Sequence, residues 1–206
     1  HCVSECGGIR IFGKRVKSLA FTTDVAIVKN INADAIMAVY PFTPQPVIAD
    51  AIISVADVPV FVGVGGGVTS GMRSYRLAIQ AEHQGAFGVV LNAPIPNDVV
   101  RLIKEDVDIP VVVTVVSETT DIQARLDAGA DILNVSGAAR TPEIVAHIRK
   151  RFPEVPIIAT GGPTDESILA TIRAGANAIT YTPPTSAALF ARSMERYREA
   201  EAPAED

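Results

Sequence analysis

Two acidic side chains, Asp24 and Glu118, each follow closely on an apolar run that is typical of a β-strand. A carboxylate that is partly buried at the end of a strand can have the raised pKa that proton transfer requires. We therefore name Asp24 and Glu118 as the candidate catalytic residues. Each of them is also a good N-cap for a following helix, and this simpler role stays open.

Uncharged polar side chains close other apolar runs, where they could orient a substrate through hydrogen bonds. The candidate substrate-binding residues are the uncharged Tyr40, Asn92, Thr114, Asn134 and Tyr181, together with Arg140, which could add a positive charge. Carboxamides and hydroxyls at such positions suit a polar ligand. Asparagine is equally suited to closing a turn, so a structural role for Asn92 and Asn134 remains an alternative.

A third candidate site follows the apolar run 155–159, which ends in Thr160 and the paired glycines Gly161 and Gly162. Glycine lets the backbone turn with its N–H groups exposed, and Thr164 then opens a helix whose N-terminus attracts anions. We predict a phosphate-binding site here, together with the loop that precedes the last helix. Its residues are Gly161, Gly162, Thr182, Thr185 and Ser186. The alternative is that the glycines only permit tight turns.

The sequence lacks the residues that several kinds of catalysis require. No lysine ends a predicted strand, which argues against a Schiff-base aldolase, and His83 and His147 fall within predicted helices. The spacing of Cys2 and Cys6 matches no zinc motif. We expect no metal site and no bound cofactor.

The elements that must position these residues alternate regularly between strand and helix. The predicted strands are 18–23, 35–40, 58–64, 87–91, 111–116, 131–135, 155–160 and 178–181. The predicted helices are 25–30, 47–55, 74–84, 98–105, 121–128, 142–151, 166–174 and 186–199. Eight strand-then-helix units of this size predict a (β/α)8 TIM barrel, an α/β fold, close to its minimum length.

An internal repeat supports the barrel. Val-Pro or Ile-Pro opens the strands near 58, 109 and 155, whereas Gly-Ala precedes those near 85, 129 and 175. Two alternating strand types match the interior of a barrel, where alternate strands fill alternate layers. We expect one domain over 1–206 with a disordered tail at 200–206. An open doubly wound sheet is the alternative, although it does not explain the repeat.

The composition of the chain limits the kinds of partner that it is expected to bind. A net charge of -5 and a pI of about 5.2 argue against a nucleic-acid surface. No apolar run approaches the roughly 18 residues of a membrane span. We expect a cytoplasmic protein with a small-molecule ligand, and a homo-oligomer stays open.

Segments 128–131, 156–162 and 174–178 resemble the aldolase-type phosphate-binding barrels, which include thiamine-phosphate synthase and sugar-phosphate epimerases. Over nearly its full length, including 21–24, 39–46 and 179–184, the chain resembles a bacterial barrel family that carries only the provisional label hydrolase. The resemblance implies a TIM barrel whose ligand is small and phosphorylated. The missing strand-end lysine departs from the Schiff-base aldolases.

Three functions remain after these observations. The first is an enzyme, provisionally a hydrolase or else a lyase or isomerase, that acts on a small phosphorylated metabolite at the C-terminal mouth of the barrel. The second is a barrel that senses a ligand without catalysis. A purely structural protein is the third.

Overall fold

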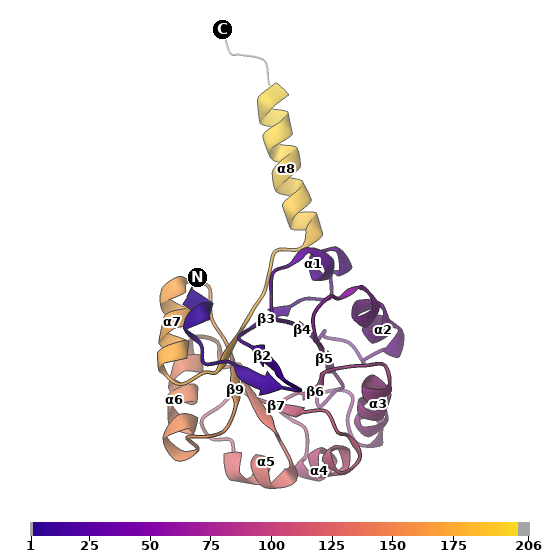
Figure 1. Cartoon of the computed structure of the whole chain (residues 1–206), viewed down its shortest axis with the longest axis vertical. Coiled ribbons are helices and arrows are strands. Elements are labelled where there is room, and N and C mark those ends of the chain that lie inside the picture. Colours follow the sequence, from indigo (N-terminus) through magenta and orange to yellow (C-terminus); the bar gives the residue numbers. More distant parts are fainter. Residues whose placement is uncertain (1, 202–206) are drawn as a thin grey trace.

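The computed structural model describes residues 2–201, and eight parallel strands close into a barrel in the order β10-β3-β4-β5-β6-β7-β8-β9 (Figure 1). The strands are β3 (Ser18–Phe21), β4 (Ala35–Ala38), β5 (Val60–Gly63), β6 (Gly88–Leu91), β7 (Val111–Val115), β8 (Ile132–Val135), β9 (Ile157–Thr160) and β10 (Ala178–Tyr181). The predicted (β/α)8 TIM barrel is confirmed, and the open sheet is wrong.

A helix follows each barrel strand. The helices are α1 (Val25–Asn30), α2 (Pro46–Val55), α3 (Met72–His83), α4 (Asn97–Asp106), α5 (Ile122–Ala128), α6 (Thr141–Arg151), α7 (Asp165–Arg173) and α8 (Ser186–Glu201). Short 3-10 helices η1 (Cys2–Glu5) and η2 (Ala138–Arg140) precede the barrel and α6. Of the predicted tail at 200–206, the first two residues belong to α8, and 202–206 lie outside the described residues.

Burial on both faces explains why the strands are almost entirely apolar. All five residues of β7 are buried, because one set of side chains fills the barrel and the other meets the helices. Inward-facing Leu19, Met37 and Val112 belong to one buried cluster, whereas outward-facing Val111 and Val113 belong to another. This alternation directs every second side chain at a strand end into the barrel mouth.

A two-stranded hairpin closes the opposite, N-terminal end of the barrel and was not predicted. Strands β1 (Ile9–Ile11) and β2 (Lys14–Val16) pair antiparallel, and they lie across the barrel in the foreground of Figure 1. Their buried side chains, Ile9, Ile11 and Val16, join the cluster inside the barrel. Phe12 at the turn packs edge-to-face on Phe87, with 5.3 Å between ring centroids. Strands of three residues are too short for their alternation to stand out in the sequence.

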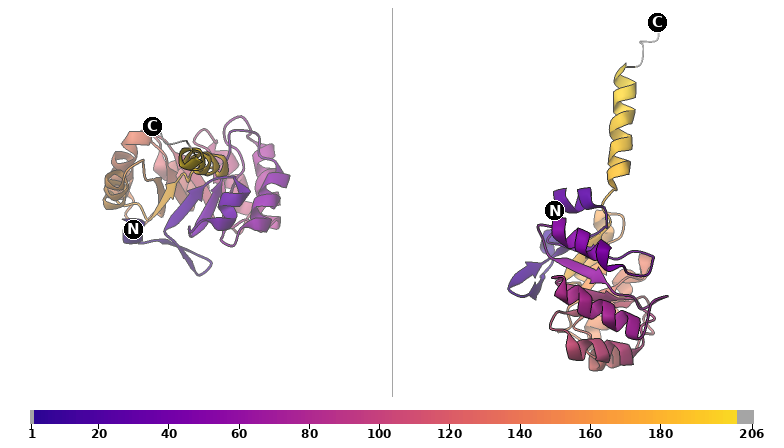
Figure 2. Two further views of the ribbon diagram at one scale, coloured as in Figure 1. Left: turned by 90° about the horizontal axis from the view of Figure 1, so that it is seen from above. Right: turned by 90° about the vertical axis from the view of Figure 1, so that its right-hand side faces the viewer.

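Helix α8 does not lie on the barrel wall. Helices α1 to α7 surround the strands, whereas α8 projects away from them along the long axis of the molecule (Figures 1 and 2). None of its residues is buried. No helix within residues 2–201 is both long and apolar enough to cross a membrane.

Candidate functional site

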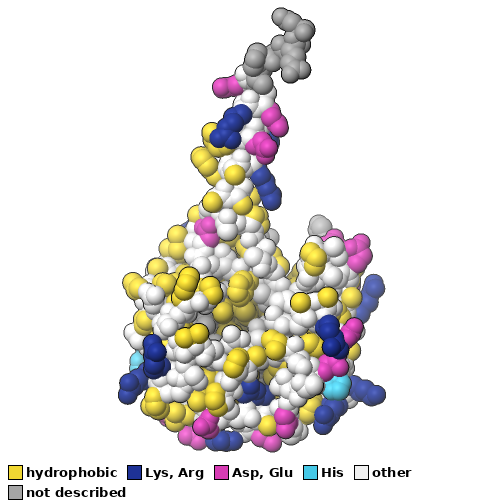
Figure 3. All heavy atoms as spheres, turned by 180° about the vertical axis from the view of Figure 1, so that it is seen from behind, with side chains coloured by type: hydrophobic (Ala, Val, Ile, Leu, Met, Phe, Trp, Pro, Cys, Tyr) yellow, Lys and Arg dark blue, Asp and Glu magenta, His cyan; other side chains and the backbone are white. Residues whose placement is uncertain are grey.

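A cavity of about 350 Å³ opens at the carboxyl ends of the barrel strands. Its mouth lies on the face turned away from the hairpin, where apolar side chains gather near the middle of the surface (Figure 3). The polar residues that line it are Tyr40, Thr43, Thr69, Asn92, Thr114, Asn134 and Ser136. Phe21, Met37 and Val90 are among the apolar ones. Active sites of TIM barrels lie at this end of the fold.

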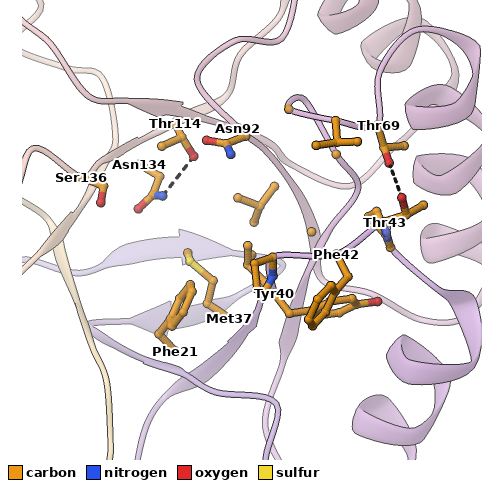
Figure 4. A pocket seen from close by; sticks show the side chains of 18 residues that line it. Phe21, Met37, Tyr40, Phe42, Thr43, Thr69, Asn92, Thr114, Asn134 and Ser136 are labelled. Carbon is orange, nitrogen blue, oxygen red and sulfur yellow. Dashed lines mark hydrogen bonds between the residues drawn. The ribbon is translucent and has the colours of Figure 1, made fainter.

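Asn134 and Thr114 form the polar floor of the pocket. The two residues are directly opposite each other in the register of β7 and β8, and Asn134 Nδ2 donates a hydrogen bond to Thr114 Oγ1 at 3.2 Å (Figure 4). Both residues are only 8% exposed. Asn134 Oδ1 is buried and has no hydrogen-bond partner among the described residues. Ser136 lies two residues further on and therefore on the same side of the chain.

Asn92 is placed by a close backbone contact with the glycine loop after β5. Its N–H donates to the carbonyl of Gly65 at 2.9 Å. Gly66 has a φ of 109°, and a Cβ there would lie 2.7 Å from Asn92 N. Asn92 Oδ1 accepts from the N–H of Ala93 at 2.8 Å, which leaves its Nδ2 as a donor on the side of Gly67. A glycine is therefore needed at position 66, where the glycine loop lies against the backbone of Asn92.

The loop after β4 forms another wall of the pocket. Tyr40 Oη accepts a hydrogen bond from the N–H of Gln45 at 2.8 Å, which ties the two ends of this loop together. Thr69 Oγ1 donates to Thr43 Oγ1 at 3.1 Å and joins the wall to the glycine loop. Phe42 is 72% exposed and stands at the rim.

Among residues 2–201, no Asp, Glu, Lys, Arg, His or Cys side chain lines this pocket. Its recognition groups are hydroxyls, carboxamides and the backbone, so it is polar without fixed charge. The only phenol among them is that of Tyr40. Elsewhere, Cys2 is partly exposed and Cys6 is buried, and burial raises the pKa of the Cys6 thiol to about 11. Cys6 is therefore a packed thiol rather than a nucleophile at neutral pH.

Asp24 is engaged by helix N-termini. Its Oδ1 accepts from the N–H groups of Ala26 and Ile27 at 3.1 and 3.3 Å, which makes it the N-cap of α1. The same carboxylate accepts from Ser186 N at 2.8 Å and Ser186 Oγ at 2.7 Å. The hydrogen bonds from Ser186 are the main reason that the pKa of Asp24 is lowered. The structure thus gives Asp24 the helix-capping role that the sequence left open and does not bring it into the pocket.

Glu118 is also outside the pocket lining. It forms an ion pair with Arg140 at 2.6 Å, and Arg140 reaches Glu143 at 3.2 Å. Hydrogen bonding to Glu143 and the nearby charge of Glu118 raise the pKa of Arg140. The charges of Glu118 and Arg140 are therefore directed at each other rather than at a shared ligand.

The predicted phosphate loops already use several of their donors within the chain. The N–H of Gly161 donates to Thr180 O at 3.2 Å. Thr164 and Ser167 form a capping box at the start of α7. In the second loop, Ser186 donates to Asp24 as described, and Thr185 Oγ1 accepts from the N–H of Ala188 at 3.1 Å. An anion would have to displace a carboxylate to reach Ser186.

Four of the six predicted substrate-binding residues, Tyr40, Asn92, Thr114 and Asn134, line the pocket. Arg140 does not, and neither does Tyr181, which alternates with the inward-facing Thr180 and packs against the outer cluster. Among the residues we had not selected as site residues, Thr43, Thr69 and Ser136 line it. The alternation of a strand indicated Ser136, and the polar, glycine-rich segment after the strand predicted at 58–64, which could cover the site, contains Thr69.

No protein-family model and no curated protein matches the chain. Solved structures do resemble it. The structure of 2,3-dimethylmalate lyase, a member of the PEP mutase/isocitrate lyase superfamily, gives a TM-score of 0.68 at 15% identity and covers 100% of this chain and 88% of that one. Phosphonopyruvate hydrolase in complex with oxalate and Mg²⁺ gives 0.65 at 17% identity, over 90% and 81%. Oxaloacetate acetylhydrolase gives 0.67 at 15% identity, over 89% and 81%.

The similarity between this chain and these solved structures is a similarity of fold. It agrees with the aldolase-type barrel that the sequence predicted. The Mg²⁺ in one of these structures prompts a comparison of donor groups, because Mg²⁺ is held in proteins largely by carboxylates and phosphates. Within residues 2–201 there is no cluster of three or more His, Cys, Asp or Glu side chains that could hold a metal ion. The pocket of this chain does not fit such a site.

Proposed function

We propose that the pocket at the barrel mouth is a substrate site and that the protein is an enzyme acting on a small polar metabolite. The observation that carries the proposal is the unpaired Oδ1 of Asn134, buried in the floor of the cavity. A buried acceptor without a partner costs about 1–3 kcal/mol. A ligand donor that reaches Oδ1 after a small rotation of the Asn134 side chain recovers part of this free energy.

The pocket favours a particular kind of ligand. An uncharged donor such as a hydroxyl or amide suits Asn134 Oδ1, while Asn92 Nδ2 offers a donor to a carbonyl or hydroxyl oxygen. Phe21, Met37 and Val90 cover the carbon skeleton. A cavity of about 350 Å³ is at the lower end of the range for small-molecule sites. The position of the pocket in the fold and the names of the similar solved structures, all enzymes, support catalysis over binding alone.

Replacing Asn134 with Leu tests the site, because the change removes the acceptor and keeps a side chain of similar size. We expect ligands from a thermal-shift screen of hydroxy acids, amides and sugars to stabilise the wild type and to lose at least tenfold in affinity for Asn134→Leu. Asn30→Leu makes the same change on α1, away from the pocket, and should bind like the wild type. Equal binding by Asn134→Leu would place the ligand elsewhere.

A phosphorylated substrate is a narrower form of the proposal. Its phosphate would rest on the turn at Gly161 and Gly162, beside the N-terminus of α7, because the pocket itself supplies no cation. Sulfate should then raise the melting temperature of the wild type and compete with the ligand. Gly162→Ala should weaken both effects, since a Cβ there would lie 2.6 Å from Ser167 Oγ and move the turn. Unchanged sulfate binding in this variant would exclude the turn.

Ligand sensing without catalysis is the second candidate, and it is favoured because none of the described residues lining the pocket has an acidic or basic side chain. The two functions differ in what happens to a bound ligand. A ligand incubated with the protein and followed by NMR should be converted if the protein is an enzyme. A ligand that binds tightly and is recovered unchanged would support the sensor.

A further inference from the structure

The two sides of the pocket differ in polarity. Strands β6 to β8 and the loops after them supply polar side chains, those of Asn92, Thr114, Asn134 and Ser136. Strands β3 to β5 and the loops after them supply most of the apolar ones, among them Phe21, Met37, Val39, Phe42, Pro44 and Val68. In Figure 4 the labelled members of these two sets lie on opposite sides of the pocket. A ligand that fills the pocket therefore meets one polar side and one apolar side.

The few polar groups on the apolar side are engaged within the chain. Tyr40 Oη accepts a hydrogen bond from the N–H of Gln45 at 2.8 Å. The hydroxyls of Thr43 and Thr69 bind each other at 3.1 Å. What this side offers to a ligand is therefore mainly carbon surface, made of aromatic rings, methyl groups and proline rings.

The apolar side continues outward to the rim of the pocket. Phe42 is 72% exposed and Val68 is 98% exposed, and both line the pocket. They lie on different loops, after β4 and after β5. The hydrogen bond between Thr43 and Thr69 joins these loops one residue further along each of them. Apolar side chains that gather at the mouth of a cavity mark a binding surface, whereas scattered ones need no explanation.

We propose that the ligand is amphipathic, with a neutral polar head at Asn134 and Asn92 and an apolar extension that leaves the pocket between Phe42 and Val68. The inference rests on the proposed function and specifies its substrate class, a primary amide or an alcohol attached to an alkyl chain or aromatic ring. The extension is the occupant of the rim because the rim residues also line the cavity. A carboxylate head would enter a pocket in which no described lining residue is a cation, so a neutral head fits better.

Two homologous series test the proposal, the unbranched primary amides from acetamide to octanamide and the primary alcohols of the same chain lengths. Each compound is titrated into the wild-type protein and followed by NMR. We expect the affinity to rise about two- to fourfold with each added CH₂, depending on how fully it is buried, until the chain has passed the rim. An affinity that does not depend on chain length would overturn the proposal.

Two valines form a matched pair of variants. Val68 and Val47 are both exposed, by 98% and 71%, but of the two only Val68 lines the pocket. Val68→Ser should lower the gain per CH₂ in the longer compounds, and Phe42→Ser should lower it further because the ring is larger. Val47→Ser should keep the wild-type gain. Since all three side chains are exposed, the variants should fold. Wild-type gains in both Val68→Ser and Phe42→Ser would mean that the rim does not touch the ligand.

Asn134→Leu distinguishes this inference from the proposed function. It should weaken every compound by a similar factor and leave the gain per CH₂ unchanged. If the short compounds bind and lose affinity in Asn134→Leu, while the longer ones gain nothing, the head-group site stands and the apolar extension is wrong. If no compound of either series binds, both proposals fail.

A second copy of the chain is the other occupant that could cover the rim. Light scattering of the wild type and of Phe42→Ser tests this alternative. We expect the two proteins to have the same mass in solution. A lower mass for Phe42→Ser would assign the rim to a contact between copies and overturn the proposal.

Discussion

Asp24 shares its two carboxylate oxygens between the N-termini of α1 and α8, and this arrangement decides its chemistry. The hydrogen bonds from Ser186, Ile27 and Ala26 stabilise the ionised form and lower the pKa of the carboxyl group. A general acid at neutral pH needs a pKa shifted in the opposite direction. We therefore assign Asp24 a structural role. Asn134 is the reverse case, because its buried Oδ1 has no hydrogen-bond partner in the part of the chain that the structure describes.

The lowered pKa of Asp24 predicts a pH dependence of stability. Since the folded-state pKa lies below the ordinary value of about 3.9, the stabilisation is complete above that value and is lost as the pH falls through the folded-state pKa. Asp24→Asn should be less stable than the wild type by about 0.3–1 kcal/mol at pH 7, the contribution of a negative charge at a helix N-terminus. Because asparagine also caps helices well, the difference comes from the lost negative charge at the two helix N-termini. It should disappear in strong acid, as measured by thermal unfolding at one protein concentration. Asp57→Asn, which breaks an exposed ion pair with Lys29, should change little at either pH.

At the scale of elements, the glycine loop between β5 and α3 illustrates how a connection shapes the site. Gly66 lies against the backbone of Asn92 in the next βα loop, and both loops border the pocket. The contact transmits any change in the glycine loop to a residue that we expect to bind the ligand.

We predict that Gly66→Ala destabilises the protein by about 1–3 kcal/mol, because alanine is strained at this φ and its Cβ would clash with Asn92. Gly67→Ala is the matched control. Its Cβ would meet only Asn92 Nδ2, at 3.7 Å, and its φ is not in the left-handed region. Thermal unfolding of the two variants measures the difference, and equal melting temperatures would contradict the steric argument.

At the scale of the whole molecule, the two ends of the barrel have different structures. The hairpin β1-β2 fills the N-terminal end with buried apolar side chains, whereas the C-terminal end keeps a polar cavity. The barrel therefore has one end built for stability and one available for a ligand, in agreement with the general organisation of TIM barrels.

Truncation of a hairpin residue should destabilise the whole barrel. Ile11 is 5% exposed and packs inside it, so Ile11→Ala should lower the free energy of unfolding by about 2–5 kcal/mol. Arg10→Ala changes the exposed neighbour on the same strand and should have little effect. Urea unfolding followed by circular dichroism measures both. Wild-type stability in Ile11→Ala would mean that the hairpin is a detachable addition.

The sequence by itself determined the barrel, because burial of a strand on two faces and of a helix on one leaves a local periodicity that repeats eight times. It also predicted that Tyr40, Asn92, Thr114 and Asn134 lie together at the barrel mouth, where all four line the pocket, since side chains at the ends of parallel strands must meet at one edge of the sheet. Tertiary structure alone decided the roles of Asp24 and Glu118 and the direction of α8. Asp24 and Ser186 are 162 positions apart, and Glu118 and Arg140 are 22 apart. A local sequence pattern does not predict which distant donor will reach a carboxylate. That donor decides whether the carboxylate caps a helix, forms an ion pair or acts as an acid.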